Sequence, residues 1–142
     1  AEETANTLRF ALSEARRTGG YVLVDGKSTS GHLKLFYSNS NADVPPAANT
    51  APINDPLTKL AVNLNLGANS FSSGVTLTPQ FRAGGQPLPQ LLIGPGLSQM
   101  QGFDGAGGGQ GALQANSGVL LRLGSRSLIV GINELSGLVT LP

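Results

Sequence analysis

The chain has 142 residues, enough for one domain with a single core of reasonable size. Only 12% of the residues are charged and the formal net charge is +1, which gives no electrostatic argument for a nucleic-acid or anionic-membrane partner. The absence of cysteine excludes thiolate catalysis, disulfides and thiolate metal sites. The sequence contains no apolar run of about 18 residues, so no membrane span is predicted within it. The acidic start is unlike a signal peptide, so we expect any anchor or export signal to lie upstream.

Residues 1–20 have the pattern of an amphipathic helix. The apolar stripe recurs at three- and four-residue steps and consists of Ala5, Leu8, Leu12 and Ala15. Gly19 and Gly20 end the helix, and Arg16 and Arg17 favour the negative end of its dipole. The helical pattern starts without an entry turn. The segment is therefore either an ordinary first helix or the lower half of a longer one.

After the helix, the apolar period changes from 3.6 to 2. Residues 21–24 read as a short buried strand, and Asp25-Gly26 is a turn dipeptide. Residues 32–37 alternate, which places Leu33, Leu35 and Tyr37 on one face of a second strand. The simplest interpretation of residues 4–37 is a helix followed by an antiparallel hairpin.

The middle of the chain contains two long segments that we predict to be irregular loops, residues 38–56 and 94–118. Both are rich in Gly, Pro, Asn and Ser, which form poor helices and strands. Between the two loops, alternation predicts a half-buried strand over 60–66, a strand over 74–78 closed by Pro79, and a short strand over 91–93. Residues 80–90 are predicted to be loop or sheet edge.

The tail, residues 119–142, predicts a three-stranded antiparallel meander. Its apolar runs are 119–123, 127–132 and 138–141, and two tight turns connect them. The whole chain, residues 1–142, is then predicted to be one α+β domain. Its N-terminal amphipathic helix packs on an antiparallel β-sheet or on a small two-sheet β-sandwich of six to eight short strands.

No group of residues predicts catalysis, so we expect a non-enzyme without a cofactor or metal. His32 is the only histidine and reads as a solvent-facing strand residue. Asp55 lies in a turn composition, with calcium ligation as the weaker alternative. The run of glycines at 105–111 lacks the Lys-Ser or Lys-Thr that a phosphate loop requires. No two carboxylates are spaced as an evident acid/base pair; they are Glu2, Glu3, Glu14, Asp25, Asp43, Asp55, Asp104 and Glu134.

Arg122 and Arg126 share one predicted hairpin. Two arginines this close could form a small positive surface for nucleic acid, although exposed hairpin arginines are commonly just solvated. DNA is therefore an alternative partner rather than the main expectation.

The two ends of the chain resemble one known family. Residues 5–24, ANTLRFALSEARRTGGYVLV, are similar to the exposed half of the N-terminal helix, and its exit into the first strand, in type IV pilins and type II secretion pseudopilins. The nearest branch is the minor subunits represented by general secretion protein H and the FimT-like minor pilins. The closing segment SLIVGINELSGLVTLP resembles the last strand–turn–strand of that family. The matching positions are Leu8, Ala11, Glu14, Ala15, Arg16, Gly19 and Gly20 at the front, and Asn133, Ser136, Gly137 and Val139 at the back.

The resemblance implies a structural minor pilin or pseudopilin that supports protein secretion or pilus biogenesis. Its partners would be other pilin or pseudopilin subunits, contacted through the helix stripe of Ala5, Leu8, Leu12 and Ala15. It would be held in the inner membrane by a hydrophobic half-helix that these residues lack. The domain itself would lie in the periplasm or on an extracellular filament.

One departure from the family pattern bears on DNA. DNA-binding members of the FimT-like branch carry arginines in the closing turn and strand, whereas residues 137–142 contain none. This favours the structural role over a DNA-binding minor pilin for natural transformation. A β-rich extracellular adhesin-like domain is a further alternative.

Overall fold

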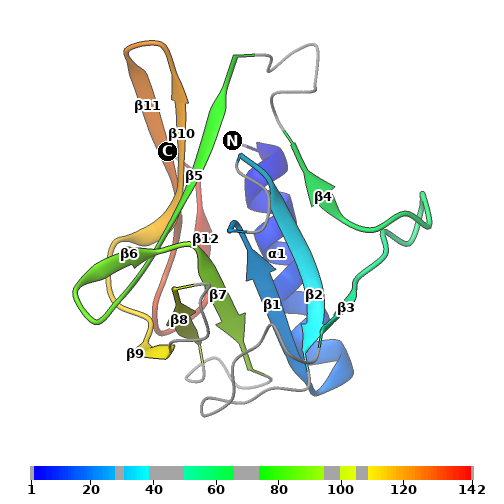
Figure 1. Cartoon of the computed structure of the whole chain (residues 1–142). Coiled ribbons are helices and arrows are strands. Elements are labelled where there is room, and N and C mark those ends of the chain that lie inside the picture. Colours follow the sequence, from blue (N-terminus) through cyan, green and yellow to red (C-terminus); the bar gives the residue numbers. More distant parts are fainter. Residues whose placement is uncertain are drawn as a thin grey trace.

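The described part of the chain consists mostly of β-strands (Figure 1). The computed structural model describes residues 2–27, 31–38, 50–65, 74–94, 100–104 and 109–141. Of these residues, 50% are in strands and 16% in the helix. The predicted α+β class is therefore wrong, because one helix accompanies two antiparallel sheets.

Helix α1 (Glu2–Thr18) forms as predicted at the start of the chain. Glu2 and Glu3 lie in its first turn and Arg16 and Arg17 in its last, which suits the helix dipole at both ends. Gly19 adopts a left-handed φ of 65°, and its N–H donates to the Ala15 carbonyl at 3.1 Å. Among the described residues, no helix has the length and apolar character needed to span a bilayer.

The first sheet has seven strands in the order β3-β2-β1-β7-β8-β9, with β4 also pairing with β2. The central pairs are antiparallel, with Leu23 opposite both Phe36 of β2 and Leu92 of β7. The strands are β1 (Tyr21–Asp25), β2 (Leu33–Ser38), β3 (Thr50–Pro52), β4 (Asn63–Leu64), β7 (Gln90–Ile93), β8 (Gln101–Phe103) and β9 (Gly109–Ala112).

The second sheet has five strands in the order β12-β11-β10-β5-β6. They are β5 (Thr76–Ala83), β6 (Gln86–Leu88), β10 (Ser117–Leu123), β11 (Arg126–Ile132) and β12 (Val139–Thr140). The predicted C-terminal meander is confirmed as β10, β11 and β12. At one point the strands β10 and β11 approach closely, because Gly118 opposes Gly131, and a Cβ atom on Gly118 would collide with the Val130 backbone carbonyl.

Several stretches predicted as loops pair as strands. Within the predicted loop 38–56, residues 50–52 form β3, and residues 39–49 lie outside the described residues. The predicted loop 94–118 contains β8, β9 and the start of β10, while 95–99 and 105–108 lie outside the described residues. Conversely, the predicted strand over 60–66 is reduced to β4 and a single bridge between Asn54 and Ala61.

One hydrophobic core joins the helix to both sheets. The apolar face of α1 packs against β1 and β7 of the first sheet and against β12 of the second. In Figure 1 the helix lies behind β1 and β2. A smaller cluster of Leu23, Leu92 and Phe103 lies on the other face of the first sheet.

Candidate functional site

The predicted assembly stripe is buried inside the domain. Ala5, Leu8, Leu12 and Ala15 are 0%, 0%, 6% and 0% exposed, and all four belong to the main core. Periodicity correctly identified the apolar face of α1, but that face is already covered by the two sheets. The buried stripe is therefore not accessible to another molecule, and the opposite face of the helix is the exposed one.

That opposite face is a polar stripe. It consists of residues spaced three or four apart, which places them along one side of a helix: Glu2, Asn6, Arg9, Ser13 and Arg16. All five are exposed. This surface carries acidic charge at the N-terminal end of the helix and basic charge toward the C-terminal end.

A groove runs between this stripe and the last turn of the chain. Its volume is about 460 Å³, and it is lined by Arg9, Leu12, Ser13 and Arg16 from α1 and by Ser136, Gly137, Leu138 and Val139 from the turn and β12. The Arg9 guanidinium donates to the Val139 carbonyl at 3.3 Å. The groove thus has an apolar floor with two arginines at its rim.

The turn that forms the second wall is held by its own hydrogen bonds. The Asn133 side-chain oxygen accepts from the Leu135 and Ser136 amides at 2.9 and 2.8 Å. Gly137, with a left-handed φ of 72°, donates its amide to the Asn133 carbonyl. These hydrogen bonds fix the conformation of the turn, which leaves Leu135 and Leu138 largely exposed.

A carboxylate, a guanidinium and a phenol connect the helix to the first sheet. Arg17 donates to both oxygens of Glu14 at 2.9 and 2.7 Å, and the Tyr37 hydroxyl donates to Glu14 Oε2 at 2.7 Å. The hydrogen bonds from Arg17 lower the pKa of Glu14 more than its partial burial raises it. The bond to Glu14 raises the pKa of Tyr37. The sequence offers a signal for the ion pair, whose i, i+3 spacing is typical of helix pairs, but none for Tyr37.

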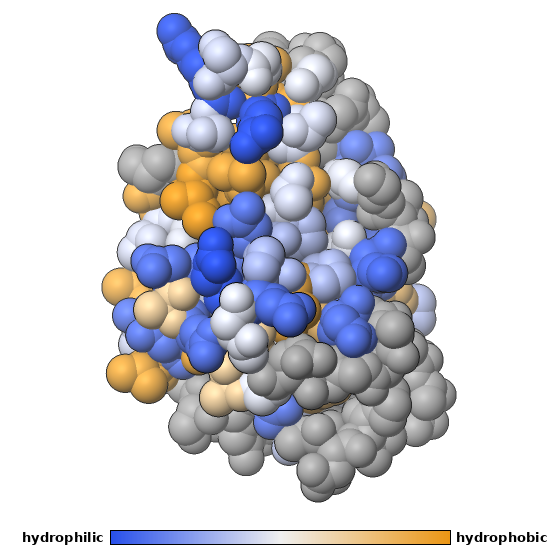
Figure 2. All heavy atoms as spheres, turned by 60° about the vertical axis from the view of Figure 1, so that its left-hand side comes forward, coloured by the Kyte–Doolittle hydropathy of each residue, from blue (hydrophilic) through white to orange (hydrophobic). Residues whose placement is uncertain are grey.

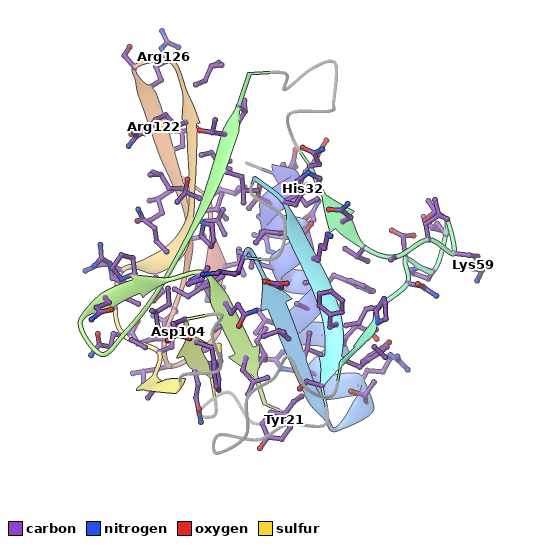
Figure 3. The ribbon with its side chains drawn as sticks, in the orientation of Figure 1. Tyr21, His32, Lys59, Asp104, Arg122 and Arg126 are labelled. Atoms are coloured by element: carbon purple, nitrogen blue, oxygen red, sulfur yellow. The ribbon has the colours of Figure 1, made fainter. Side chains whose placement is uncertain are left out.

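Arg122 and Arg126 lie near the tip of the β10–β11 hairpin (Figure 3), and the strand register places them on opposite faces of it. Leu123 pairs with Arg126 and Arg122 pairs with Ser127, so the alternation of side chains separates the two arginines. A phosphate backbone lying on one face of the hairpin would meet only one of them. The strand register therefore separates the two arginines that share this hairpin.

The remaining candidate residues make structural contacts. His32 Nδ1 lies 2.8 Å from the Asn63 side-chain oxygen. The carboxylate of Asp55 accepts from the amides of Leu57 and Thr58, which confirms the predicted turn. Of the glycine run 105–111, only 109–111 are described, and they belong to β9. Across the described ranges, no three metal-binding side chains of His, Asp or Glu gather. Asp43 lies outside those ranges.

Comparisons with protein-family models, with curated proteins and with solved structures gave no match.

Proposed function

We propose that this chain is the head domain of a minor pilin or pseudopilin, a structural subunit that assembles with related subunits into a type IV pilus or a type II secretion pseudopilus. The proposal rests on the resemblance of the two chain ends to that family. A membrane-anchored helix upstream and a periplasmic or extracellular domain belong to the same proposal.

One structural observation supports it above the others. The two segments that carry the resemblance lie side by side, because α1 packs against β12 and Arg9 donates to Val139, 130 residues along the chain. The two ends resemble one family and also form one surface. A shared role explains this better than two unrelated coincidental matches do. The groove between them is the surface we assign to neighbouring subunits.

This assignment moves the contact away from the buried stripe. A partner would meet Ser13 and the rim arginines Arg9 and Arg16 on the helix, together with the exposed Leu138 of the closing turn. Apolar contact at the centre with charged groups at the rim is the usual composition of a protein interface.

The test is single-cysteine cross-linking, since these 142 residues contain no cysteine. In cells that carry the protein's own secretion or pilus genes, Ser13→Cys and Leu138→Cys are expected to cross-link to other subunits. The exposed Gln86→Cys on β6 is the matched control and should not. The proposal fails if the groove variants behave like the control, or if the same cross-links form in cells without those genes.

A further inference from the structure

The turn at residues 133–138, which forms one wall of the groove, occurs a second time in the chain. Residues 55–60 read DPLTKL and residues 133–138 read NELSGL, with an Asx residue, two leucines and a hydroxyl residue at matching places. The backbone and side-chain hydrogen bonds agree one for one, and the fifth residue has a left-handed φ in both turns, 63° for Lys59 and 72° for Gly137. These bonds explain the Asx and hydroxyl residues but not the leucines, whose side chains take no part in them.

The leucines of both turns are largely exposed. Leu57 and Leu60 are 91% and 69% exposed, and Leu135 and Leu138 are 75% and 64% exposed. Pairs of exposed leucines that the turn itself does not require indicate contact with another molecule. Apolar exposure alone does not identify that molecule, since Figure 2 shows a further apolar patch below the hydrophilic tip of the molecule, over the β10–β11 hairpin.

Charge distinguishes the hollows that these two turns form against α1. The groove beside residues 133–138 is lined by Arg9 and Arg16 and by no acidic side chain. The hollow beside residues 55–60, of about 290 Å³, is lined by no cation, and its one charged residue is Asp55, whose carboxylate already accepts from two amides. Of the two hollows, only the groove therefore combines an exposed leucine with positive charge.

The two groove arginines lack the carboxylate partner that the neighbouring Arg17 has. Arg17 donates to both oxygens of Glu14. Among the described residues, the Arg16 guanidinium makes no hydrogen bond or ion pair, and the Arg9 guanidinium makes one hydrogen bond, to the Val139 carbonyl. A guanidinium carries several N–H donors in a planar fork, so most donors of this pair remain available to a ligand. The bond to Val139 also fixes one of the two cations at the rim of the groove before any ligand binds.

We propose that the groove binds an acidic segment of the neighbouring subunit, with an Asp or Glu carboxylate at Arg9 and Arg16 and an apolar side chain of the same segment against Leu138. The two arginines are two helical turns apart, about 10 Å along the helix axis, so each can hold its own carboxylate or both can converge on one. A carboxylate matches the guanidinium fork and forms short, charge-assisted hydrogen bonds with it. This inference rests on the proposed function, which assigns the groove to a neighbouring subunit, and it adds the chemistry that recognises that subunit.

The composition of the groove favours a protein carboxylate over a phosphate group of nucleic acid or lipid. Duplex DNA carries one negative charge about every 1.7 Å, and its binding requires a track of several cations. Anionic lipid surfaces attract clusters of about 4–8 basic residues. The groove offers two cations beside an exposed leucine, which is the composition of a protein interface.

The test adds a charge change to the cells that carry Ser13→Cys. Arg16→Glu reverses one rim charge without removing a side-chain hydrogen bond of the fold, and it is expected to lower the cross-link yield on the order of tenfold. Lys59→Glu, in the second turn and outside the groove, is the matched control and should leave the yield unchanged. Cooperative urea unfolding of both purified variants would show that both fold. Arg16→Gln, which removes the charge without reversing it, should lower the yield less.

The outcomes separate this inference from the proposed function. An unchanged yield with Arg16→Glu, or an equal loss with Lys59→Glu, overturns the acidic-segment assignment while the subunit contact itself stands. Absence of cross-links from Ser13→Cys without any charge change overturns both. Mass spectrometry of the digested cross-linked product then identifies the partner segment, which is expected to contain an Asp or Glu close to the linked site. Replacing that carboxylate by Lys should restore the yield in the Arg16→Glu cells, because opposite charges face each other again. A segment without an acidic residue, or a charge exchange that restores nothing, overturns the assignment.

Two phosphate-bearing probes complete the experiment. The purified chain is mixed at low salt with vesicles of phosphatidylcholine and phosphatidylglycerol and, separately, with a short DNA duplex. Neither probe is expected to bind in a way that depends on Arg16, because the groove lacks the further cations that a phosphate surface requires. Binding of either probe that Arg16→Glu abolishes and Lys59→Glu preserves overturns the proposal, since the groove would then recognise phosphate.

Discussion

Thr4 is a polar side chain in an apolar position. It is fully buried on α1, and its hydroxyl has no hydrogen-bond partner among the described residues. The other helix threonines differ, because Thr7 donates to the Glu3 carbonyl at 2.9 Å and Thr18 to the Glu14 carbonyl at 2.7 Å. A buried hydroxyl that has lost water without gaining a partner destabilises the folded state.

Replacing Thr4 by the isosteric valine is expected to raise the free energy of unfolding by about 1 kcal/mol, since it removes the unpaired hydroxyl and keeps the shape. Urea denaturation followed by circular dichroism measures the change. Thr7→Val removes a paired hydroxyl and should be neutral or slightly destabilising. A loss of stability in Thr4→Val would contradict the absence of a partner for this hydroxyl.

The Glu14–Arg17–Tyr37 group predicts how stability depends on pH. The pKa of Glu14 is lowered in the fold, so its contribution is complete above its ordinary pKa of 4.5 and is lost as the pH falls through the folded-state value. The pKa of Tyr37 is raised, so its contribution is complete below the ordinary tyrosine value of 10.0 and is lost as the pH rises through the folded-state value.

Glu14→Gln is therefore expected to cost about 1 kcal/mol at neutral pH, a modest figure because Arg17 is largely exposed to solvent. Urea titrations from pH 7 to pH 3 should show the difference between wild type and variant shrinking toward acid. Tyr37→Phe tests the second bond, and its cost should shrink instead above pH 10. A difference that is constant across the acid range would show that the carboxylate charge is not involved.

At the scale of single elements, periodicity predicted most strands whose side chains alternate and missed those that contain proline or several glycines. β5 continues through Pro79, the residue predicted to close this strand. Pro79 lies opposite Val119, whose own backbone groups point toward β11, so the missing proline amide costs no bond to β10. Such tolerance depends on the partner strand, which a local pattern cannot identify.

The predicted strand over 60–66 forms only in part, as β4 and the bridge at Ala61, because a local turn prevails over the alternation at its start. Leu60 is 69% exposed, and its carbonyl accepts from the Asp55 amide at 2.8 Å. Lys59 adopts a left-handed φ of 63°, which breaks the extended backbone. The hydrogen bonds of the Asp55 side chain stabilise this turn more than the apolar alternation after it favours an extended strand.

The burial of the helix stripe gives a prediction for α1. Leu8→Asp would place an unpaired charge in the core and is expected to cost about 4 kcal/mol or more, enough to unfold a domain of ordinary stability. Ser13→Asp, on the exposed face, should stay within about 0.5 kcal/mol of wild type. Circular dichroism and urea denaturation compare the two. A folded Leu8→Asp protein would show that the stripe is not core.

The close approach of β10 and β11 gives a second stability prediction. Gly118→Ala is expected to cost about 3 kcal/mol, because the new methyl group meets backbone that cannot rotate away. Gly20→Ala, whose Cβ would lie 3.7 Å from the Thr18 hydroxyl, fits without collision and serves as the control. Thermal unfolding should separate the two variants by many degrees. Equal melting temperatures would mean that the strands can separate at this point.

At the scale of the whole molecule, the sequence predicted the two ends better than the middle. The helix, its exit and the closing meander have regular patterns and formed as expected. The class was wrong because Gly- and Pro-rich segments supplied short strands whose pairing depends on distant neighbours. The candidate site was predicted only in part. Periodicity identifies the apolar face of a helix, but it does not say whether the sheets of the same domain or another molecule cover that face. No local signal could have joined Arg9 to Val139.

One core shared by the helix and both sheets predicts cooperative unfolding. Tyr21 and Tyr37 report on the first sheet, and the chain has no tryptophan to mask them. Val119→Ala, in the second sheet, should lower the stability by about 2 kcal/mol and shift the tyrosine fluorescence and circular dichroism midpoints together. Two separate transitions would show that the sheets unfold independently.

The contact between α1 and β12 also sets an order of events during synthesis. The ribosome makes the helix first and the strand that packs on it 130 residues later, on the order of ten seconds at typical translation rates. Throughout that interval the nascent chain carries an amphipathic helix whose apolar side is not fully covered. The domain is therefore completed only when its last strand emerges, and until then it depends on whatever protects nascent chains from association.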